Sequence, residues 1–242
     1  MSGHSQFANI KHRKDAQDNK RGKIFQKITR EIYVAVKAGG SFPENNPKLR
    51  AILEKARTLN MPKDNINRAI KKASSQGDTT NYEEVVYEGY GPGSIALIIH
   101  CLTDNKNRTA SNIRSYFNKC QTKLGTPNSV QYLFSKAGVI EFSSKLSAYE
   151  VLELVLDYDV LDVQKDEDVL HIAVEVKDLL NVAETLNQVG IENFITNEIR
   201  NMPLEYTTAE DINSDQDLNL YQKLLDLLAE DEDVQLVESN FK

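Results

Sequence analysis

The first regular pattern of apolar residues has the period of an α-helix. With residues placed about 100° apart, the apolar side chains of residues 22–38 fall in one stripe roughly 120° wide, formed by Ile24, Phe25, Ile28, Ile32, Ala35 and Val36. The opposite side carries Lys20, Lys23, Lys27, Arg30 and Lys37. Gly39 and Gly40 are typical of a helix C-terminus. We therefore predict a helix over residues 22–38 that packs with one face and is positively charged on the other.

Two shorter helices are predicted next. Asn46 fits the N-cap position and Pro47 the first turn of a helix, and Asn60-Met61-Pro62 ends that helix and starts another. Their apolar stripes consist of Leu49, Ile52, Leu53 and Ala56 in the first and of Ile66, Ala69, Ile70 and Ala73 in the second. Three short helices around one core therefore fit residues 20–76. Residues 1–19 show no apolar periodicity, so we expect a mobile arm there that turns helical only near Asp15.

From Tyr82 onward the period of the apolar residues changes to two, which indicates strands. Strands are predicted over residues 85–87 and 95–102, followed by a helix over 107–118 and a strand over 130–134. A second series then gives strand 139–142, helix 148–156, strands 160–163 and 169–174, helix 179–189 and strand 194–199. This βαββαβ order is that of a ferredoxin-like domain.

The last segment predicts a helix over residues 218–229 and a strand over 234–237, which cannot form a domain alone. They would complete the unfinished ββαβ unit of residues 82–135. The pattern thus predicts an α+β, multidomain fold with a three-helix domain at residues 1–79 and two ferredoxin-like α+β domains, one inserted in the other. The discontinuous domain would comprise residues 80–135 and 206–242, and the inserted one residues 136–205.

The distribution of charge adds a functional signal to this organisation. The net charge of the 242 residues is −7. Residues 1–80 hold 17 Lys and Arg against 7 Asp and Glu, which gives +10, whereas residues 81–242 hold 12 against 29, which gives −17. Such a division suggests a polyanion-binding end joined to an acidic body.

Other classes of protein find little support in the sequence. No stretch approaches the roughly 18 apolar residues of a membrane span, and residues 1–30 lack the apolar region of a secretory signal. Cys101 and Cys120 match no metal or redox spacing, so we expect reduced thiols in a cytoplasmic protein. His4, His12, His100 and His171 are scattered, and no nucleophile motif, zinc spacing or nucleotide fingerprint occurs. We therefore expect no enzyme activity, no cofactor and no metal.

Residues 88–93 (EGYGPG) have the glycine density of a phosphate-binding loop. No Lys-Ser or Lys-Thr follows them, and no helix is predicted directly afterwards, so the P-loop interpretation fails. A turn between two strands that requires positive φ is the favoured interpretation.

The basic N-terminal region is the best candidate for a binding site. Nucleic acid presents an array of phosphates, which clustered Lys and Arg on a helix and a flexible arm can follow, and Phe7 could stack on a base or wedge into a base step. The alternative is a solvated helix face without function. The candidate nucleic-acid-binding residues are His4, Phe7, Asn9, Lys11, His12, Arg13, Lys14, Lys20, Arg21, Lys23, Lys27, Arg30 and Arg108.

A second basic stretch begins at residues 103–109 (TDNKNRT). Asp104 or Asn105 can cap the helix that follows, which needs no function. The basic residues here, Lys106, Arg108, Arg114, Lys119 and Lys123, are the basic part of an otherwise acidic body and could form a second contact surface.

Several segments resemble the YebC/PmpR family: residues 1–5 (MSGHS), 8–14 (ANIKHRK), 20–25 (KRGKIF), 60–65 (NMPKDN), 87–93 (YEGYGPG) and 102–109 (LTDNKNRT). The match runs nearly end to end and is dense through residue 118. The resemblance implies a bacterial-type cytoplasmic protein of three domains, one helical and two α+β. Members are described as DNA-binding transcriptional regulators, and others, including mitochondrial relatives, as translation factors at the ribosome. Gln6-Phe7 stand where the family commonly has Lys-Trp, and residues 122–125 and 131–132 also differ, which affects fine specificity.

We therefore predict a nucleic-acid-binding regulator of gene expression. We expect DNA as its partner, with ribosomal RNA as the alternative. The acidic domains are a possible site for a protein partner. A protein-interaction module without nucleic-acid binding is the second alternative. Changing Lys23, Lys27 and Arg30 together to Glu should abolish binding and leave the fold intact.

Overall fold

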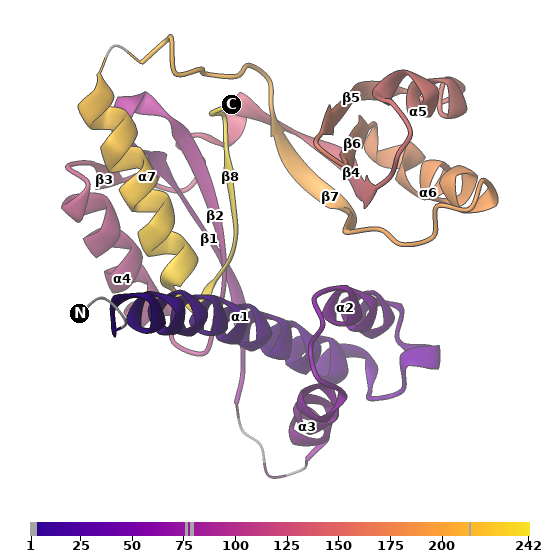
Figure 1. Cartoon of the computed structure of the whole chain (residues 1–242), viewed down its shortest axis with the longest axis horizontal. Coiled ribbons are helices and arrows are strands. Elements are labelled where there is room, and N and C mark those ends of the chain that lie inside the picture. The colour runs from indigo at the N-terminus through magenta and orange to yellow at the C-terminus, as the bar shows by residue number, and fades with distance from the viewer. Residues whose placement is uncertain (1–3, 76, 78–79, 213) are drawn as a thin grey trace. The chain divides into compact units, whose positions relative to one another are not determined.

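The computed structural model describes residues 4–75, 77, 80–212 and 214–242, with side chains from Arg21 onward. By their internal contacts these residues divide into two compact units, one of residues 1–127 and 212–237 and the other of residues 128–211 and 238–242. The first unit contains both the N-terminal helices and one sheet, and the second contains another sheet (Figure 1). The three-domain boundaries at residues 79, 135 and 205 stay predictions. None of the described helices is both long and apolar enough to cross a membrane.

Three helices form the N-terminal core of the first unit. Helix α1 spans His4–Gly39, α2 Pro47–Thr58 and α3 Lys63–Ser74, and a 3-10 turn, Pro43–Asn45, precedes α2. The buried residues include Ile28, Ile32, Ala35, Val36, Leu49, Ile52, Leu53, Ala56, Ile66, Ala69 and Ala73, as predicted, with Phe25 and Ile70 packed against them. Ile24 is 40% exposed, so its place in the predicted stripe is wrong. Among the described side chains of α1, Phe25 is the first that packs against the core, and Ile24 lies at the edge of the packed face.

Helix α1 is also longer than predicted. The expected arm at residues 1–19 is helical from His4 onward, in one unbroken helix of 36 residues. Residues 4–21 contain Ala, Gln, Lys and Arg, which have high intrinsic helix propensity, and no Pro. The absence of an apolar stripe predicted an irregular segment, whereas propensity and continuity with a packed helix favour the helical backbone. Residues 1–3 of the expected arm lie outside the described residues.

The sheet of the first unit has the strand order β3-β1-β2-β8. Its strands are β1 (Glu83–Tyr90), β2 (Ala96–Thr103), β3 (Lys123–Leu124) and β8 (Val234–Ser239). Strands β1 and β2 are antiparallel in register from Glu83↔Thr103 to Tyr90↔Ala96. Helices α4 (Lys106–Lys119) and α7 (Asp215–Glu230) contact each other beside this sheet (Figure 1). The C-terminal strand therefore joins the strands of residues 83–124.

The turn between β1 and β2 has the predicted character. Pro92–Ser94 form a short 3-10 turn in which Gly93 has φ +68°, and a Cβ on Gly93 would lie 3.0 Å from the side chain of Ile212. Gly93 thus serves both a positive φ and a close approach. The predicted strand at 130–134 is wrong, because Gln131–Leu133 are a 3-10 turn and strand β4 begins at Phe134. The backbone of Val130, with ψ −9°, is not extended, so this residue does not belong to a strand.

The second unit has the element order βαββαβ. It consists of β4 (Phe134–Ser143), α5 (Ala148–Leu154), β5 (Val160–Asp166), β6 (Val169–Val174), α6 (Leu179–Gln188) and β7 (Thr196–Pro203). The antiparallel strand order β5-β6-β4-β7 is that of a ferredoxin-like sheet. Ser147 and Glu150 form a capping box at the start of α5. The predicted α+β fold class is confirmed.

Candidate nucleic-acid interface

Three basic side chains of α1, those of Lys23, Lys27 and Arg30, lie against a short acidic segment of the same unit. Residues 230–233, which are the last residue of α7 and the three that connect it to β8, read Glu-Asp-Glu-Asp and are called the acidic turn below. The Nζ atom of Lys23 lies 3.9 Å from Oε1 of Glu230. Nζ of Lys27 donates to the carbonyl oxygen of Ala229 at 3.3 Å, and burial lowers the pKa of Lys27. The side chains of Lys23 and Lys27, in the middle of α1, therefore already make contacts within the protein.

Arg30 is the most deeply engaged of these residues. Its Nη1 donates to the carbonyl oxygens of Leu102 at 3.2 Å and Glu232 at 2.8 Å, and also to the carboxylate of Asp233. Its Nη2 lies 3.1 Å from Oε2 of Glu232. The side chain is 13% exposed, and the guanidinium lies over the ring of Tyr82. Arg30 fastens α1 to the acidic turn, so it is not available to a phosphate in this structure.

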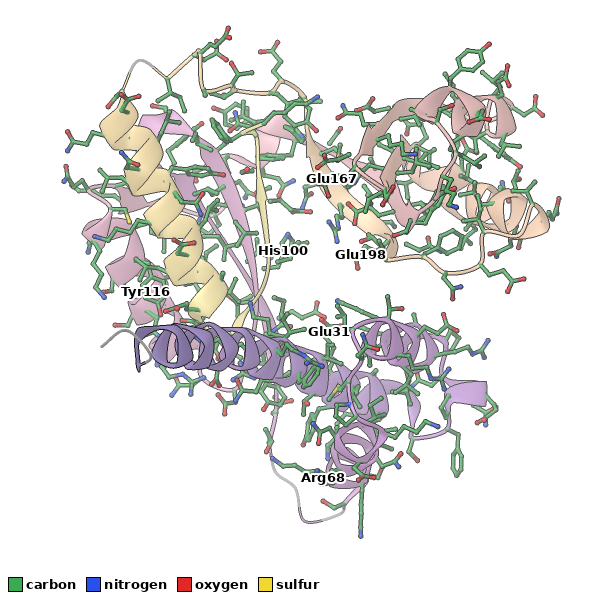
Figure 2. All side chains as sticks on the ribbon, in the orientation of Figure 1. Glu31, Arg68, His100, Tyr116, Glu167 and Glu198 are labelled. Carbon is green, nitrogen blue, oxygen red and sulfur yellow. The ribbon has the colours of Figure 1, made fainter. Side chains whose placement is uncertain are left out.

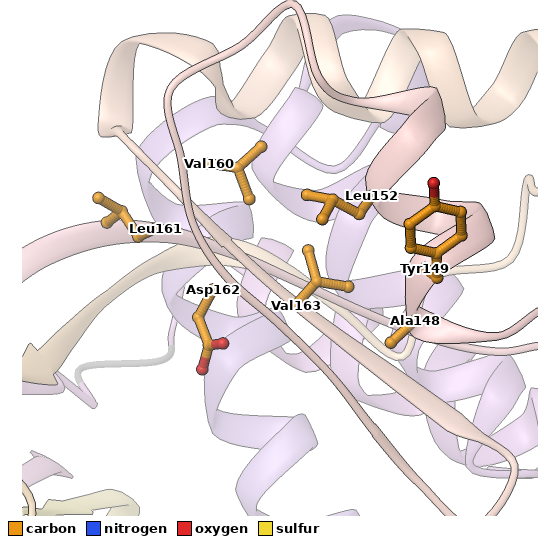
Figure 3. Close-up of a pocket in the computed structure, with 7 residues that line it drawn as sticks. All are labelled: Ala148, Tyr149, Leu152, Val160, Leu161, Asp162 and Val163. Atoms are coloured by element: carbon orange, nitrogen blue, oxygen red, sulfur yellow. The ribbon is translucent and has the colours of Figure 1, made fainter.

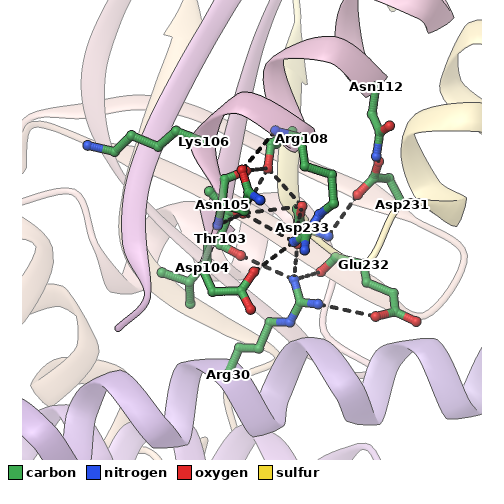
Figure 4. A network of polar contacts seen from close by, with 12 residues as sticks. Arg30, Thr103, Asp104, Asn105, Lys106, Arg108, Asn112, Asp231, Glu232 and Asp233 are labelled. Atoms are coloured by element: carbon green, nitrogen blue, oxygen red, sulfur yellow. Dashed lines mark hydrogen bonds and ion pairs between the residues drawn. The ribbon is translucent and has the colours of Figure 1, made fainter. Parts of the chain in front are cut away.

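Asp233 is the centre of this network (Figure 4). Its carboxylate accepts from Nη2 of Arg108 at 2.9 and 3.0 Å and from Oγ1 of Thr109 at 2.8 Å, in addition to Arg30. The residue is 2% exposed. Burial alone would raise the pKa of Asp233, but the hydrogen bonds from Arg108, Thr109 and Arg30 bring that pKa below its ordinary value of 3.8. A buried carboxylate with three such donors is held in its charged form.

The acidic turn is also held by helix α4. Oδ2 of Asp231 accepts from the hydroxyl of Tyr116 at 2.8 Å and from Nδ2 of Asn112 at 3.2 Å. Figure 2 labels Tyr116 on this helix. Burial, and then the bond to Asp231, raise the pKa of the Tyr116 hydroxyl, which keeps it protonated as the donor. Helices α1 and α4 are thus anchored on the same four residues.

The predicted binding residues consequently separate into groups. Lys23, Lys27, Arg30 and Arg108 contact the acidic turn or its neighbours, and Arg108 also pairs with Asp104 at 2.8 Å. Arg21 is exposed, with its guanidinium 6.0 Å from the ring centre of Phe25. The remaining candidates have a helical backbone in α1, but their side chains lie outside the described residues: His4, Phe7, Asn9, Lys11, His12, Arg13, Lys14 and Lys20.

The acidic turn is the structural element beside the predicted binding residues that reasoning from the sequence missed. Its four acidic residues were counted in the acidic body, where they carried no separate meaning. Helical spacing identified the three basic positions of α1 but could not pair them with residues about 200 positions later. The one available signal was the strength of the acidic run directly after a helix. The carboxylates of that run form ion pairs with Lys23 and Arg30 of α1.

The hollow of the second unit and the two cysteines offer little chemistry. An open hollow of about 360 Å³ in the second unit is lined by Ala148, Tyr149, Leu152, Val160, Leu161, Asp162 and Val163, which are mostly apolar (Figure 3). Cys101 and Cys120 are buried free thiols, and burial raises the pKa of Cys101 to about 12. Within the described part of the chain, no group of three His, Cys, Asp or Glu side chains could hold a metal ion.

Comparison with known proteins places this architecture in a family. The model of the TACO1/YebC N-terminal domain matches residues 5–76, and that of the TACO1/YebC second and third domains matches residues 82–241. A protein of Geobacillus kaustophilus named as a probable transcriptional regulatory protein is 44% identical over 99% of this chain and 97% of its own length. A protein of Finegoldia magna with the same name is 43% identical over 100% and 99%.

A solved structure agrees with these matches. The crystal structure of a conserved hypothetical protein from Aquifex aeolicus superposes with a TM-score of 0.81 at 40% sequence identity, covering 92% of this chain and 90% of that one. The two family models together span both compact units, apart from short gaps. The chain belongs to the TACO1/YebC family.

Proposed function

We propose that this protein is a non-enzymatic, DNA-binding regulator of transcription whose phosphate contacts come from the N-terminal half of α1. The observation that carries the proposal is the extent of that helix. Among the residues with described side chains its packed core begins at Phe25, and the helix starts at His4. Residues 4–23 contain six Lys and Arg against two Asp, a net charge of +4.

The dimensions of this segment suit a nucleic-acid partner. Twenty helical residues are about 30 Å long, and the major groove of duplex DNA admits an α-helix. A single helix with basic residues along it can place several of them near successive phosphates. A rigid helix also loses less conformational entropy on binding than a flexible arm would. The N-terminal half of α1 therefore replaces the predicted arm as the binding element.

The names of the relatives support DNA before RNA. The proteins of Geobacillus kaustophilus and Finegoldia magna are named as probable transcriptional regulatory proteins. A role at the ribosome is the alternative outcome of the test below. Lys23, Lys27 and Arg30 contact the acidic turn or its neighbours, so they are unsuited to that test. Changing Arg30 to Glu would place a second carboxylate against Asp233 and disturb the fold.

The test measures the affinity of the full chain for a labelled 30-base-pair duplex as a function of salt. With about six phosphates contacted, log affinity should fall with log salt with a slope near −5. Changing Lys11, Arg13 and Lys14 together to Gln should reduce the steepness by about 2.7, since each lost contact removes about 0.9. The affinity at 0.1 M salt should fall more than tenfold.

A matched control changes Lys63, Lys71 and Lys72 of α3 to Gln, which removes the same charge from exposed positions of the same helical region. This control should change the slope by less than the α1 variant does. Equal slopes for the two variants, or a wild-type slope near zero, would refute the proposal. Tighter binding to a 30-nucleotide RNA than to the duplex at every salt concentration would favour the role at the ribosome.

A further inference from the structure

Helix α4 presents an open face that is free of acidic residues. Residues 105–140 contain no Asp or Glu, although residues 81–242 as a whole contain 29. Within this stretch the α4 sequence is KNRTASNIRSYFNK. The segment carries six Lys and Arg, so its own net charge is positive, and a polyanion can approach such a charge.

The three sides of α4 have different surroundings. Thr109, Ile113 and Phe117 are buried against the sheet, and Asn112 and Tyr116 bind Asp231 of the acidic turn. The remaining side lines an open hollow of about 460 Å³, formed by Ser111, Arg114, Ser115, Asn118 and Lys119. These positions follow the i, i+3, i+4, i+7 spacing of one helix face. The hollow therefore belongs to a side that folding leaves free.

The cations of this face differ from the two basic residues at the start of the same helix. Lys106 and Arg108, at the start of α4, pair with Glu83, Asp104 and Asp233. By contrast, among the described residues no carboxylate pairs with Arg114, Lys119 or Lys123, and the Nζ atom of Lys119 lies 5.8 Å from the ring centre of Tyr116. Lys123 lies on β3, which contacts α4. Three exposed cations thus have no carboxylate partner in the part of the chain that the structure describes.

The polar residues beside these cations complete the chemistry of a phosphate site. Ser hydroxyls and the Asn amide donate hydrogen bonds to phosphate oxygens, and Arg binds them in a bidentate manner. Ser111, Ser115 and Asn118 supply such donors between Arg114 and Lys119. Apolar side chains are absent from the residues that line the hollow, which argues against a hydrophobic peptide as its occupant.

We propose that the face of α4 formed by Ser111, Arg114, Ser115, Asn118 and Lys119, together with Lys123, is a second contact surface for the phosphodiester backbone of duplex DNA. It rests on the proposed binding of DNA by α1 and extends it to a second element. Both helices are anchored on the acidic turn, α1 through Arg30 and α4 through Asn112 and Tyr116. The proposal requires that one duplex contacts both helices.

The test changes Arg114, Lys119 and Lys123 together to Gln in the full chain and repeats the salt titration with the 30-base-pair duplex. The slope should become less steep by about 2.7, which corresponds to three lost phosphate contacts, and the affinity at 0.1 M salt should fall at least tenfold. The thermal midpoint should stay within a few degrees of wild type, because exposed substitutions seldom change stability.

The matched control changes Lys136, Lys145 and Lys177 to Gln, which removes the same charge from exposed positions of the second unit. If the α4 variant behaves like this control while the α1 variant loses binding, the α4 surface is refuted and the proposed function stands. If the wild-type protein binds no duplex, the proposed function fails first. A loss seen with RNA but not with the duplex, or one equally large for a polyglutamate of matched charge, would overturn the assignment to DNA.

Discussion

At the scale of single residues, Asp233 connects three parts of the first unit. It lies in the acidic turn, and its donors come from α1 and from the start of α4. Removing one partner of a buried ion pair leaves the other charge without compensation, which costs about 3–5 kcal/mol. The exposed pairs of the same unit, such as Lys48 with Glu84, contribute much less because solvent screens them.

The change Asp233→Asn should therefore lower the free energy of unfolding by about 3 kcal/mol at pH 7. The pKa of Asp233 is lowered in the folded protein, so the unfolded chain takes up the proton first as the pH falls. The contribution of the carboxylate is full well above pH 3.8 and is lost as the pH falls through the lowered pKa. Denaturant titrations from pH 7 to pH 2 should show the two proteins converging below about pH 4. A constant difference would contradict this account, and Glu84→Gln is the control.

Asn46 shows how far single residues could be predicted. Its position before Pro47 predicted an N-cap, and Oδ1 of Asn46 does accept from the amide of Leu49 at 3.0 Å. Its Nδ2 also donates to the carbonyl oxygens of Ala35 and Gly40 at 2.8 and 2.9 Å, which joins α2 to the end of α1. Capping is a local property and can be read from neighbouring residues. The bonds to α1, like those of Asp233, depend on tertiary structure.

At the scale of elements, helices with an apolar stripe were predictable and the first half of α1 was not. The apolar stripe of α2, from Leu49 to Ala56, is buried as expected. A helix that buries one face has apolar residues at the helical period, so this pattern is visible in the sequence. Residues 4–21 have no such stripe, and only propensity and attachment to a packed helix favour their helical backbone. The 3-10 turn at Gln131–Leu133 was missed for a related reason, since short apolar runs have no reliable period.

The helical state of this half of α1 can be tested by the change Ala16→Pro. Proline in a helix interior costs about 3 kcal/mol and disrupts the turn before it. The packed part of α1 should therefore begin near residue 16, residues 4–15 should lose their helical structure, and the far-ultraviolet circular dichroism should weaken. The cooperative unfolding midpoint should change little, because the core residues with described side chains all lie at or after Phe25. Duplex affinity should fall at least tenfold if binding needs a continuous helix. Ala16→Ser, which preserves the helix, is the control, and equal affinity of the two variants would favour a flexible arm.

At the scale of the whole molecule, the charge follows the division into compact units. The first unit, residues 1–127 and 212–237, holds 23 Lys and Arg against 18 Asp and Glu, a net charge of +5. The second unit, residues 128–211 and 238–242, holds 6 against 18, a net charge of −12. The sequence alone showed a basic end and an acidic body. In the structure most of the net negative charge lies in the second, ferredoxin-like unit. The first unit contains the acidic turn, but the basic residues of α1 and α4 outweigh it.

This division predicts where a bound duplex protects the protein. A unit with a charge of −12 repels phosphates within about one Debye length, roughly 8 Å at physiological salt, so DNA should contact the first unit and leave the second in solvent. Hydrogen exchange at saturating duplex should slow in α1 and α4 and stay unchanged in α5, α6 and strands β4 to β7. Protection within α5 or β5 would contradict the electrostatic argument. Unchanged exchange there leaves the acidic unit free for a partner of opposite charge, which a duplex bound to α1 and α4 would not displace.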